Sequence, residues 1–210
     1  MAPQLTLYHC PYSRSTGVLT LLEELHAPYD LHVMNMKKGE NREAAYLAVN
    51  PMGKVPAVRH GDAVITEQVA IYLYLADLFP DAKLAPPLGD PLRGPYLRWM
   101  AFYGSCFEPA VVDKWMKNAP ADKASCHYGD FDTMFNTLIE QLSKGPYLLG
   151  ERFSALDVLW ASAMGWMGMY ELLPKLPVIE QYVARVTSRP SFAAANAKDG
   201  ELAAAQAAAA

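Results

Sequence analysis

The stretch between residues 50 and 75 constrains the fold of this chain more than any other part of its sequence. It reads N-P-M-G-K-V-P-A-V, crosses a short polar turn, and continues T-E-Q-V-A-I-Y-L-Y-L. Pro56 cannot donate a ladder hydrogen bond, so it belongs at the start of a strand or on an edge. A turn at Gly61 separates two short strands, and Thr66 is placed to cap a helix that starts with Glu67. The stretch therefore predicts strand, turn, strand and helix.

The residues before this stretch alternate between strand-like and helix-like patterns. A strand ending near His9 is followed by a loop at 10–13 and a helix with leucines and a valine on one face. A second strand is expected at about 29–34 and a short helix around 43–48. The predicted order is βαβαββα, ending near residue 80.

A proline-rich segment divides the chain in two. Residues 81–91, D-A-K-L-A-P-P-L-G-D-P, contain three prolines and a glycine, which is typical of a linker. Beyond it the pattern is helical, with the first helix interrupted at Glu108. The sequence thus predicts a domain at 1–80, a linker at 81–91 and an all-helical domain at 92–210.

Two features of the helical half are informative. Ser154 and Asp157, in the order S-x-x-D, are placed to form a capping box at the start of a buried helix, a folding element. The alanine-rich tail from Ser191 favours helix. We expect its final stretch to fray, because alanine side chains have little to bury.

Composition and charge exclude several classes of function. A net charge of -4 and a pI near 5.7 argue against nucleic acid as a partner. The three cysteines, Cys10, Cys106 and Cys126, do not form a disulfide framework and suit a reducing cytoplasm. We find no signal peptide, no apolar run long enough to span a membrane and no spacing typical of a metal site. A cytoplasmic globular protein is expected.

The order of elements and the motifs resemble the cytosolic glutathione S-transferases, of the bacterial, serine-type, theta-like kind, over about residues 5–192. Val55-Pro56 is similar to that family's Val-cis-Pro, and Glu67-Gln68 is similar to its Glu-Ser or Gln-Ser pair. The resemblance implies a thioredoxin-like α/β domain followed by an all-α domain. It also implies glutathione as co-substrate, a small electrophile as second substrate, and a homodimer.

The resemblance further implies how glutathione is held. The Val55 backbone would pair with the cysteinyl part as an added strand, next to a cis Pro56. Glu67, Gln68 and the helix start would hold the γ-glutamyl end. Lys54 is similar to the residue that the family places near the glycine carboxylate, although a solvated turn lysine is an equally good interpretation.

Glutathione chemistry requires a thiolate, and there are two candidates for the catalytic residue. A serine would stabilise the thiolate of glutathione, whereas a cysteine would react through its own sulfur. A thiol of pKa near 8.5 is only about 3% ionised at pH 7, and lowering that pKa by about two units corresponds to roughly 2.7 kcal/mol. Ser13 lies where serine-type members place the activating hydroxyl, although it could simply cap the helix. Cys10, in C-P-Y-S, resembles the glutaredoxin and omega-type cysteine, which would form a mixed disulfide instead. His9 is expected to be structural or exposed.

The second substrate is expected over Tyr12 and a helical stripe that includes Trp99 and Tyr103, although aromatics at this spacing more often form a core than the wall of a ligand pocket. The leading hypothesis is conjugation of glutathione to small apolar electrophiles. The alternatives are a cysteine-type thiol transferase or reductase, and a non-catalytic binding scaffold.

Overall fold

The computed structural model describes residues 5–118 and 122–209, so the predicted domain ends at residues 1–4 and 210 lie outside it. The chain divides into two compact units. Unit 1 comprises residues 1–82 together with 188–210, and unit 2 comprises residues 83–187. Each unit is described by itself below.

A four-stranded mixed sheet forms the centre of unit 1. Its order is β2-β1-β3-β4, with β1 parallel to β2, and β3 antiparallel to both β1 and β4. Tyr8 in β1 lies opposite His32 on one side and Ala57 on the other, so the end of β1 meets the start of β3. The strand bounds are β1 Leu5–His9, β2 Asp30–Val33, β3 Ala57–His60 and β4 Ala63–Ile65.

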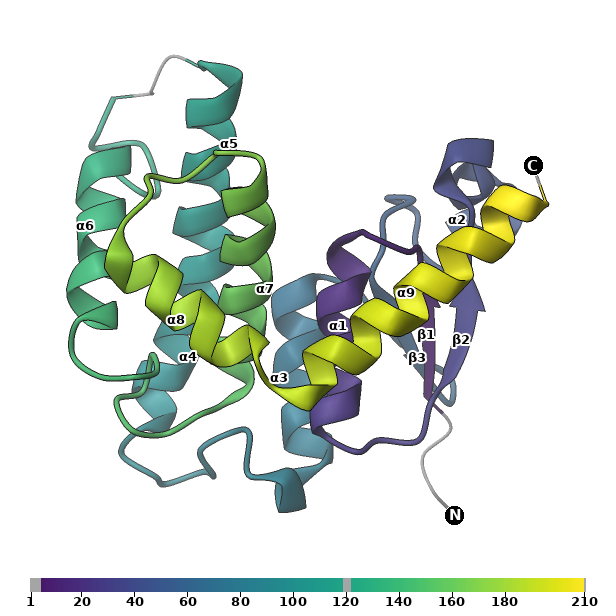
Figure 1. Cartoon of the computed structure of the whole chain (residues 1–210), viewed down its shortest axis with the longest axis horizontal. Helices are drawn as coiled ribbons and strands as arrows, with labels where there is room; N and C mark the ends of the chain where they lie inside the picture. Colours follow the sequence, from purple (N-terminus) through teal and green to yellow (C-terminus); the bar gives the residue numbers. More distant parts are fainter. Residues whose placement is uncertain (1–4, 119–121, 210) are drawn as a thin grey trace. The chain divides into compact units, whose positions relative to one another are not determined.

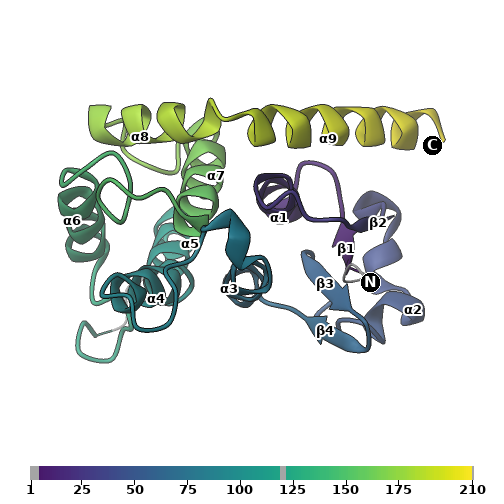
Figure 2. The ribbon, with the colours of Figure 1, turned by 90° about the horizontal axis from the view of Figure 1, so that it is seen from below.

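Helices cover both faces of this sheet. Figure 2 shows α1 (Arg14–Glu24) and α3 (Gln68–Leu78) on one side and the short α2 (Ala44–Leu47) on the other. Short 3-10 turns join the elements: Met36–Lys38, Glu40–Arg42 and Pro80–Ala82. Apolar side chains at the α1–sheet–α3 contacts are fully buried, among them Leu7, Leu19, Val58, Ile71 and Leu75. This confirms the predicted βαβαββα order and the thioredoxin-like fold class.

The cap of α3 differs from the prediction. Glu67, not Thr66, is the N-cap residue, and the helix begins at Gln68. Glu67 has φ +64° and ψ +117°, a non-helical conformation, so the helix cannot extend back through it. No side chain caps this end.

Helix α9 (Pro190–Ala208) is the main departure from the predicted domains. The prediction of a frayed tail is wrong, because α9 lies along α1 and forms part of unit 1 (Figures 1 and 2). Phe192, Ala195 and Asp199 recur on one face and are buried there. At its start, Arg189 and Ser191 both bind the carboxylate of Glu24 in α1, each at 2.6 Å. Small side chains on this face allow close packing, which a sequence-based estimate of buried area overlooks.

Unit 2 is built from helices. Their bounds are α4 Arg93–Phe102, α5 Glu108–Met116, α6 Phe131–Leu142, α7 Ala155–Met169 and α8 Pro177–Thr187. The predicted break at Glu108 is wrong, because a π-helical turn, Tyr103–Phe107, joins α4 to α5. Pro109 stands in the first turn of α5, directly after this π-helical turn.

The buried helix α7 begins with the predicted capping box. The Ser154 N–H donates to Asp157 Oδ2 at 2.9 Å, and the other carboxylate oxygen accepts from the Leu148 N–H and the Tyr182 hydroxyl, each at 3.0 Å. Asp157 is fully buried, and burial raises its pKa to about 6. Across residues 5–118 and 122–209, the structure has no helix with the length and apolarity needed to cross a membrane.

Candidate active site

The loop between β1 and α1 carries the two rival thiol-activating residues. Ser13 is the N-cap of α1: its Oγ accepts from the Ser15 N–H at 3.1 Å and donates to the Cys10 carbonyl at 2.7 Å. Tyr12 has φ +56°, a left-handed conformation unusual for a residue with a side chain, and its ring is exposed. Ser13 is half-buried, so its hydroxyl is both anchored and accessible.

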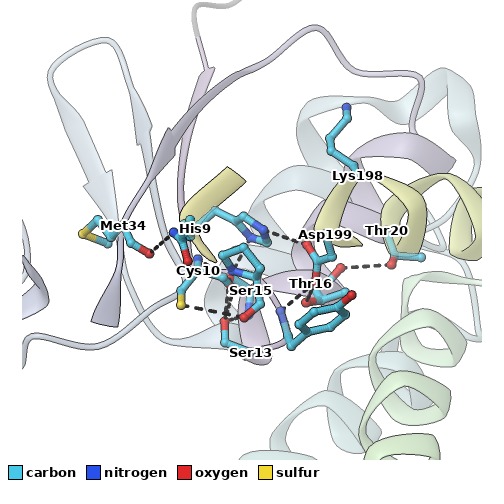
Figure 3. Close-up of polar contacts among 12 residues, drawn as sticks. His9, Cys10, Ser13, Ser15, Thr16, Thr20, Met34, Lys198 and Asp199 are labelled. Atoms are coloured by element: carbon cyan, nitrogen blue, oxygen red, sulfur yellow. Dashed lines mark hydrogen bonds and ion pairs between the residues drawn. The ribbon is translucent and has the colours of Figure 1, made fainter. Parts of the chain in front are cut away.

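Ser15, one position inside the helix, holds the loop in place through hydrogen bonds of its hydroxyl group. It is fully buried, and its Oγ lies 2.7 Å from Ser13 Oγ and 2.8 Å from His9 Nδ1. The same oxygen accepts from the Cys10 N–H at 3.1 Å. One buried hydroxyl thus joins the end of β1 to the start of α1 (Figure 3).

Asp199 of α9 closes the network from the other side. Its Oδ1 lies 2.8 Å from His9 Nε2, while Oδ2 accepts from the Tyr12 N–H at 2.8 Å and from Thr16 Oγ1 at 2.6 Å. Burial opposes ionisation, but the hydrogen bonds from His9, Thr16 and the Tyr12 amide hold the pKa of Asp199 below its usual value. The carboxylate is therefore charged at neutral pH, and it fixes the unusual backbone of Tyr12.

Cys10 lies in a different environment from Ser13. It is half-buried, and its Sγ contacts the Pro11 carbonyl oxygen at 3.7 Å. A carbonyl oxygen accepts from a thiol and offers nothing to a thiolate. The Cys10 thiol thus points to the loop backbone, whereas Ser13 is held at the helix start.

The loop before β3 is held by three side-chain amide or hydroxyl groups. Asn41 donates to the Gly53 carbonyl at 2.8 Å, and Tyr46 and Asn50 both donate to the Lys54 carbonyl. Gly53 has φ +61°, and a Cβ there would come within 2.8 Å of the Asn41 carbonyl oxygen, so only glycine fits.

This loop presents the residues expected to bind glutathione. The Val55–Pro56 bond is cis, as predicted, and Lys54 is exposed. Val55 precedes β3, which pairs with β1 from Ala57 opposite Tyr8. Its backbone therefore lies at the same end of the sheet as Cys10.

The start of α3 lies beside the start of α1. Gln68 Nε2 donates to the Arg14 carbonyl at 3.4 Å, while its Oε1 is buried and has no hydrogen-bond partner in the structure. Glu67 is exposed next to it. Two helix starts, a free amide oxygen and a carboxylate thus lie together in unit 1.

The predicted second-substrate residues belong to different units. Tyr12 is in unit 1, whereas Trp99 and Tyr103 are each only 2% exposed in unit 2, where both rings pack edge-on against Trp160. They are core residues, because the stripe that carries them faces α7. Trp99 and Arg98 also line a groove of about 550 Å³, which is formed by residues of unit 2.

His9, Ser15 and Asp199 are the residues that sequence reasoning missed as parts of one site. His9 was expected to be structural or exposed, and it is fully buried in a polar network. A signal for Asp199 exists: it falls on the helical stripe of Phe192 and Ala195, where a charged residue needs a partner. Among the described residues, no group of three or more His, Cys, Asp and Glu side chains is arranged to hold a metal ion.

A thioredoxin-like unit with a hydroxyl at the α1 start and a cis-proline before β3 defines the class of enzymes that bind a thiol substrate. Comparisons with known proteins identify the family. The model for the "Glutathione S-transferase, N-terminal domain" matches residues 3–77. Glutathione S-transferase APIC of Nicotiana tabacum is 34% identical over 199 residues, covering 87% of this chain and 92% of that protein.

Solved structures agree. The glutathione transferase of Methylococcus capsulatus has a TM-score of 0.78 at 30% identity, covering 93% of this chain and 98% of that one. A glutathione transferase homologue from Sulfitobacter, solved with bound glutathione, has a TM-score of 0.72 at 28% identity with the same coverage. The chain belongs to the glutathione S-transferase family. This confirms the predicted family, its fold class and its enzyme class, a transferase with glutathione as co-substrate.

Proposed function

We propose that this protein is a serine-type glutathione transferase in which Ser13 donates a hydrogen bond to the glutathione thiolate. The Ser13 hydroxyl at the start of α1 carries the proposal: its oxygen is held by the Ser15 N–H, and its hydrogen, which donates to the Cys10 carbonyl in this structure, can turn to a ligand. A charge-assisted hydrogen bond together with the helix N-terminus is of the size needed to lower a thiol pKa by about two units.

The rest of glutathione would bind along the two other elements at this end of the sheet. The Val55 backbone, held next to cis Pro56, is positioned to pair with the cysteinyl part as an added strand. Glu67 and the unpaired Gln68 Oε1 suit the ammonium of the γ-glutamyl end. Lys54, exposed at the loop tip, suits the glycine carboxylate.

A pair of substitutions separates the serine mechanism from the cysteine one. Ser13→Ala should raise the pKa of the bound thiol and reduce conjugation at neutral pH by about one to two decades, with recovery at higher pH. Cys10→Ser should leave conjugation nearly intact. The measurement is a pH–rate profile of both variants with one electrophile and one disulfide substrate.

The opposite order would support the alternative: loss of disulfide reduction in Cys10→Ser with a normal electrophile profile in Ser13→Ala indicates a cysteine-type thiol transferase. A binding scaffold would bind glutathione by calorimetry yet conjugate nothing. Because Ser13 is the N-cap of α1 and the Cys10 thiol points to the Pro11 carbonyl, we expect the serine order.

Three finer statements rest on the family alone. They are a small apolar electrophile as second substrate, a homodimer, and a cytoplasmic location. Light scattering of the purified protein measures the mass, and a monomer at micromolar concentration would contradict the second statement. Conjugation rates across electrophiles of graded polarity measure the first.

A further inference from the structure

A continuous chain of short hydrogen bonds leads from Ser13 into the interior of unit 1. Ser13 Oγ lies 2.7 Å from Ser15 Oγ, which lies 2.8 Å from His9 Nδ1. His9 Nε2 lies 2.8 Å from Asp199 Oδ1. Figure 3 shows these four side chains in sequence, drawn from β1, α1 and α9. The order carboxylate, imidazole, hydroxyl is that of a charge-relay triad with a second hydroxyl added.

The hydrogen positions follow from the partners. An ionised Asp199 can only accept, so His9 Nε2 carries the hydrogen of that bond and Nδ1 of the neutral ring is an acceptor. Ser15 then donates to Nδ1, and its oxygen can accept from Ser13, whose hydrogen also faces the Cys10 carbonyl at 2.7 Å. With Ser13 donating to Ser15, both bonds between Ser13 and His9 point inward, toward the imidazole.

We propose that this chain is a proton relay, in which His9 stores the proton that glutathione loses when its thiol ionises. The inference rests on the proposed role of Ser13 as the group that contacts the sulfur. Neither His9 nor Asp199 touches the substrate, so both are positioning residues that act through Ser15 and Ser13.

The transfer balances without any other reactant. The S–H bond breaks with its electron pair left on sulfur, and the proton goes to Ser13 Oγ. Ser13 passes its own proton to Ser15, and Ser15 passes its own to His9 Nδ1. All three bonds then point outward, from His9 to Ser15 to Ser13 to the thiolate. When the conjugate and its leaving group depart, the proton passes back through Ser15 and Ser13 to the leaving group or to water, because the thiolate has been consumed.

The surroundings of His9 favour this storage. The ring is fully buried, and an imidazolium there would be costly without a counter-charge. Asp199 supplies that charge from the opposite side, and its own solvation is replaced by the Thr16 hydroxyl and the Tyr12 amide. Asp199 Oδ1 is in direct contact with the ring, 2.8 Å from Nε2.

Other titratable groups near the network are already engaged. Lys198, next to Asp199 in α9, points away from His9 in Figure 3 and binds Tyr29 at 2.7 Å and Glu23 at 3.3 Å. The titratable groups around the His9 imidazole are thus Cys10 in the loop and Asp199 and Lys198 in α9. Tyr29 and Glu23 lie beyond Lys198.

The test counts protons and thiolates separately when glutathione binds. Thiolate is measured by its ultraviolet absorbance, and protons released to solvent are measured by calorimetry in buffers of different ionisation enthalpy. Binding of S-methylglutathione, which has no thiol proton, is subtracted as the baseline. We expect the wild-type enzyme at neutral pH to form the thiolate while releasing far fewer protons than thiolates.

Two variants test whether His9 holds the proton, and a third serves as a control. His9→Gln keeps an amide donor for Asp199 but removes the base, and Ser15→Ala interrupts the chain while leaving both ends. Each should release about one proton per thiolate and raise the pKa of the bound thiol by about one unit, a tenfold loss of thiolate below that pKa. Thr20→Val is the matched control: it removes a buried hydroxyl of α1 that donates to the Thr16 carbonyl, outside the chain, and should keep the wild-type proton count.

Each outcome of these measurements either supports or overturns the relay. Stoichiometric proton release by the wild-type enzyme overturns the relay, and so does proton retention in folded His9→Gln, since the proton would then be elsewhere. An equal change in Thr20→Val would show that the loss of any buried α1 hydroxyl produces the effect, and it would also overturn the relay. Failure of the Ser13 assignment is distinct: Ser13→Ala would then leave the bound thiol pKa unchanged, whatever the proton count.

Discussion

Glu67 holds a backbone conformation that a residue with a side chain adopts only at a cost. Its φ of +64° is shared in sign by Tyr12, at +56°, and both residues stand at the loop-to-helix junctions of the candidate site. Such conformations persist where the surroundings impose them and are frequent at ligand sites. The strain at Glu67 thus supports a role for its side chain and helix start in binding.

Two substitutions at Glu67 separate the side chain from the backbone. Glu67→Ala and Glu67→Gly should weaken glutathione binding equally, because both remove the carboxylate. Glu67→Gly should be more stable than Glu67→Ala by about 1 kcal/mol, since glycine adopts positive φ without a Cβ clash. Calorimetry and urea unfolding measure the two effects. Unchanged glutathione affinity in both variants would contradict the γ-glutamyl assignment.

How far the sequence predicts the site depends on sequence distance. Pro56, Ser13 and Glu67 belong to local motifs whose turn and cap chemistry is visible in adjacent residues. The His9–Asp199 bond joins positions 190 residues apart, and no local pattern reports it. The prediction that Trp99 lines the second-substrate pocket rests on a local pattern that is ambiguous. A helical aromatic stripe has the same spacing whether it faces a ligand or a core.

Among the elements, α9 shows what a composition-based expectation leaves out. Its alanines have little area to bury, yet Ala195 is fully buried and the helix extends to Ala208. Long side chains at its ends supply the anchors: Arg189 binds Glu24, and Gln206 donates to the Met34 carbonyl at 3.1 Å. The helix is held by polar contacts spaced along a close-packed seam, not by a large apolar face.

Acid should loosen α9 through these carboxylates. Burial raises the pKa of Glu24, but the bonds from Arg189 and Ser191 outweigh it and leave the pKa below its usual value. A lowered folded pKa gives stability that is complete above the unfolded pKa and is lost as pH falls through the folded one. Glu24→Gln should therefore reduce amide-exchange protection of α9 about tenfold at about pH 7, given the usual worth of a charged hydrogen bond.

Below the lowered folded pKa of Glu24 the wild type and Glu24→Gln should exchange alike, since protonation then removes the charge. Comparing the two proteins at the same pH cancels the intrinsic pH dependence of exchange. A tenfold difference that persists in acid would show that shape, rather than charge, makes the contact.

At the scale of the whole chain, the order of elements was predictable and the grouping of the last helix was not. Hydrophobic periodicity places the strands and helices, and capping residues place the α7 start. Periodicity does not identify the partner of an amphipathic face, so residues 188–210 were assigned to the helical domain by adjacency. The buried Asp199 and the Glu24 pair place them in unit 1 instead.

The two units should respond to pH in opposite directions. In unit 2, burial raises the pKa of Asp157 to about 6, above its value of 3.8 in a model compound. A raised folded pKa gives stability that is present below the unfolded pKa and is lost as pH rises through the folded one. A shift of about two units corresponds to roughly 3 kcal/mol, which unit 2 should gain between about pH 7 and about pH 4.

Tryptophan fluorescence can follow this gain, because all four tryptophans lie between residues 83 and 187. Asp157→Asn keeps the shape of the side chain but cannot titrate. It should be less stable than the wild type at neutral pH. An NH2 group replaces one of the two carboxylate oxygens that accept from Ser154, Leu148 and Tyr182. The gap in urea-unfolding free energy should widen as pH falls toward 4, by about 3 kcal/mol. A gap that stays constant over this range would mean that Asp157 titrates in the folded chain as it does in the unfolded one.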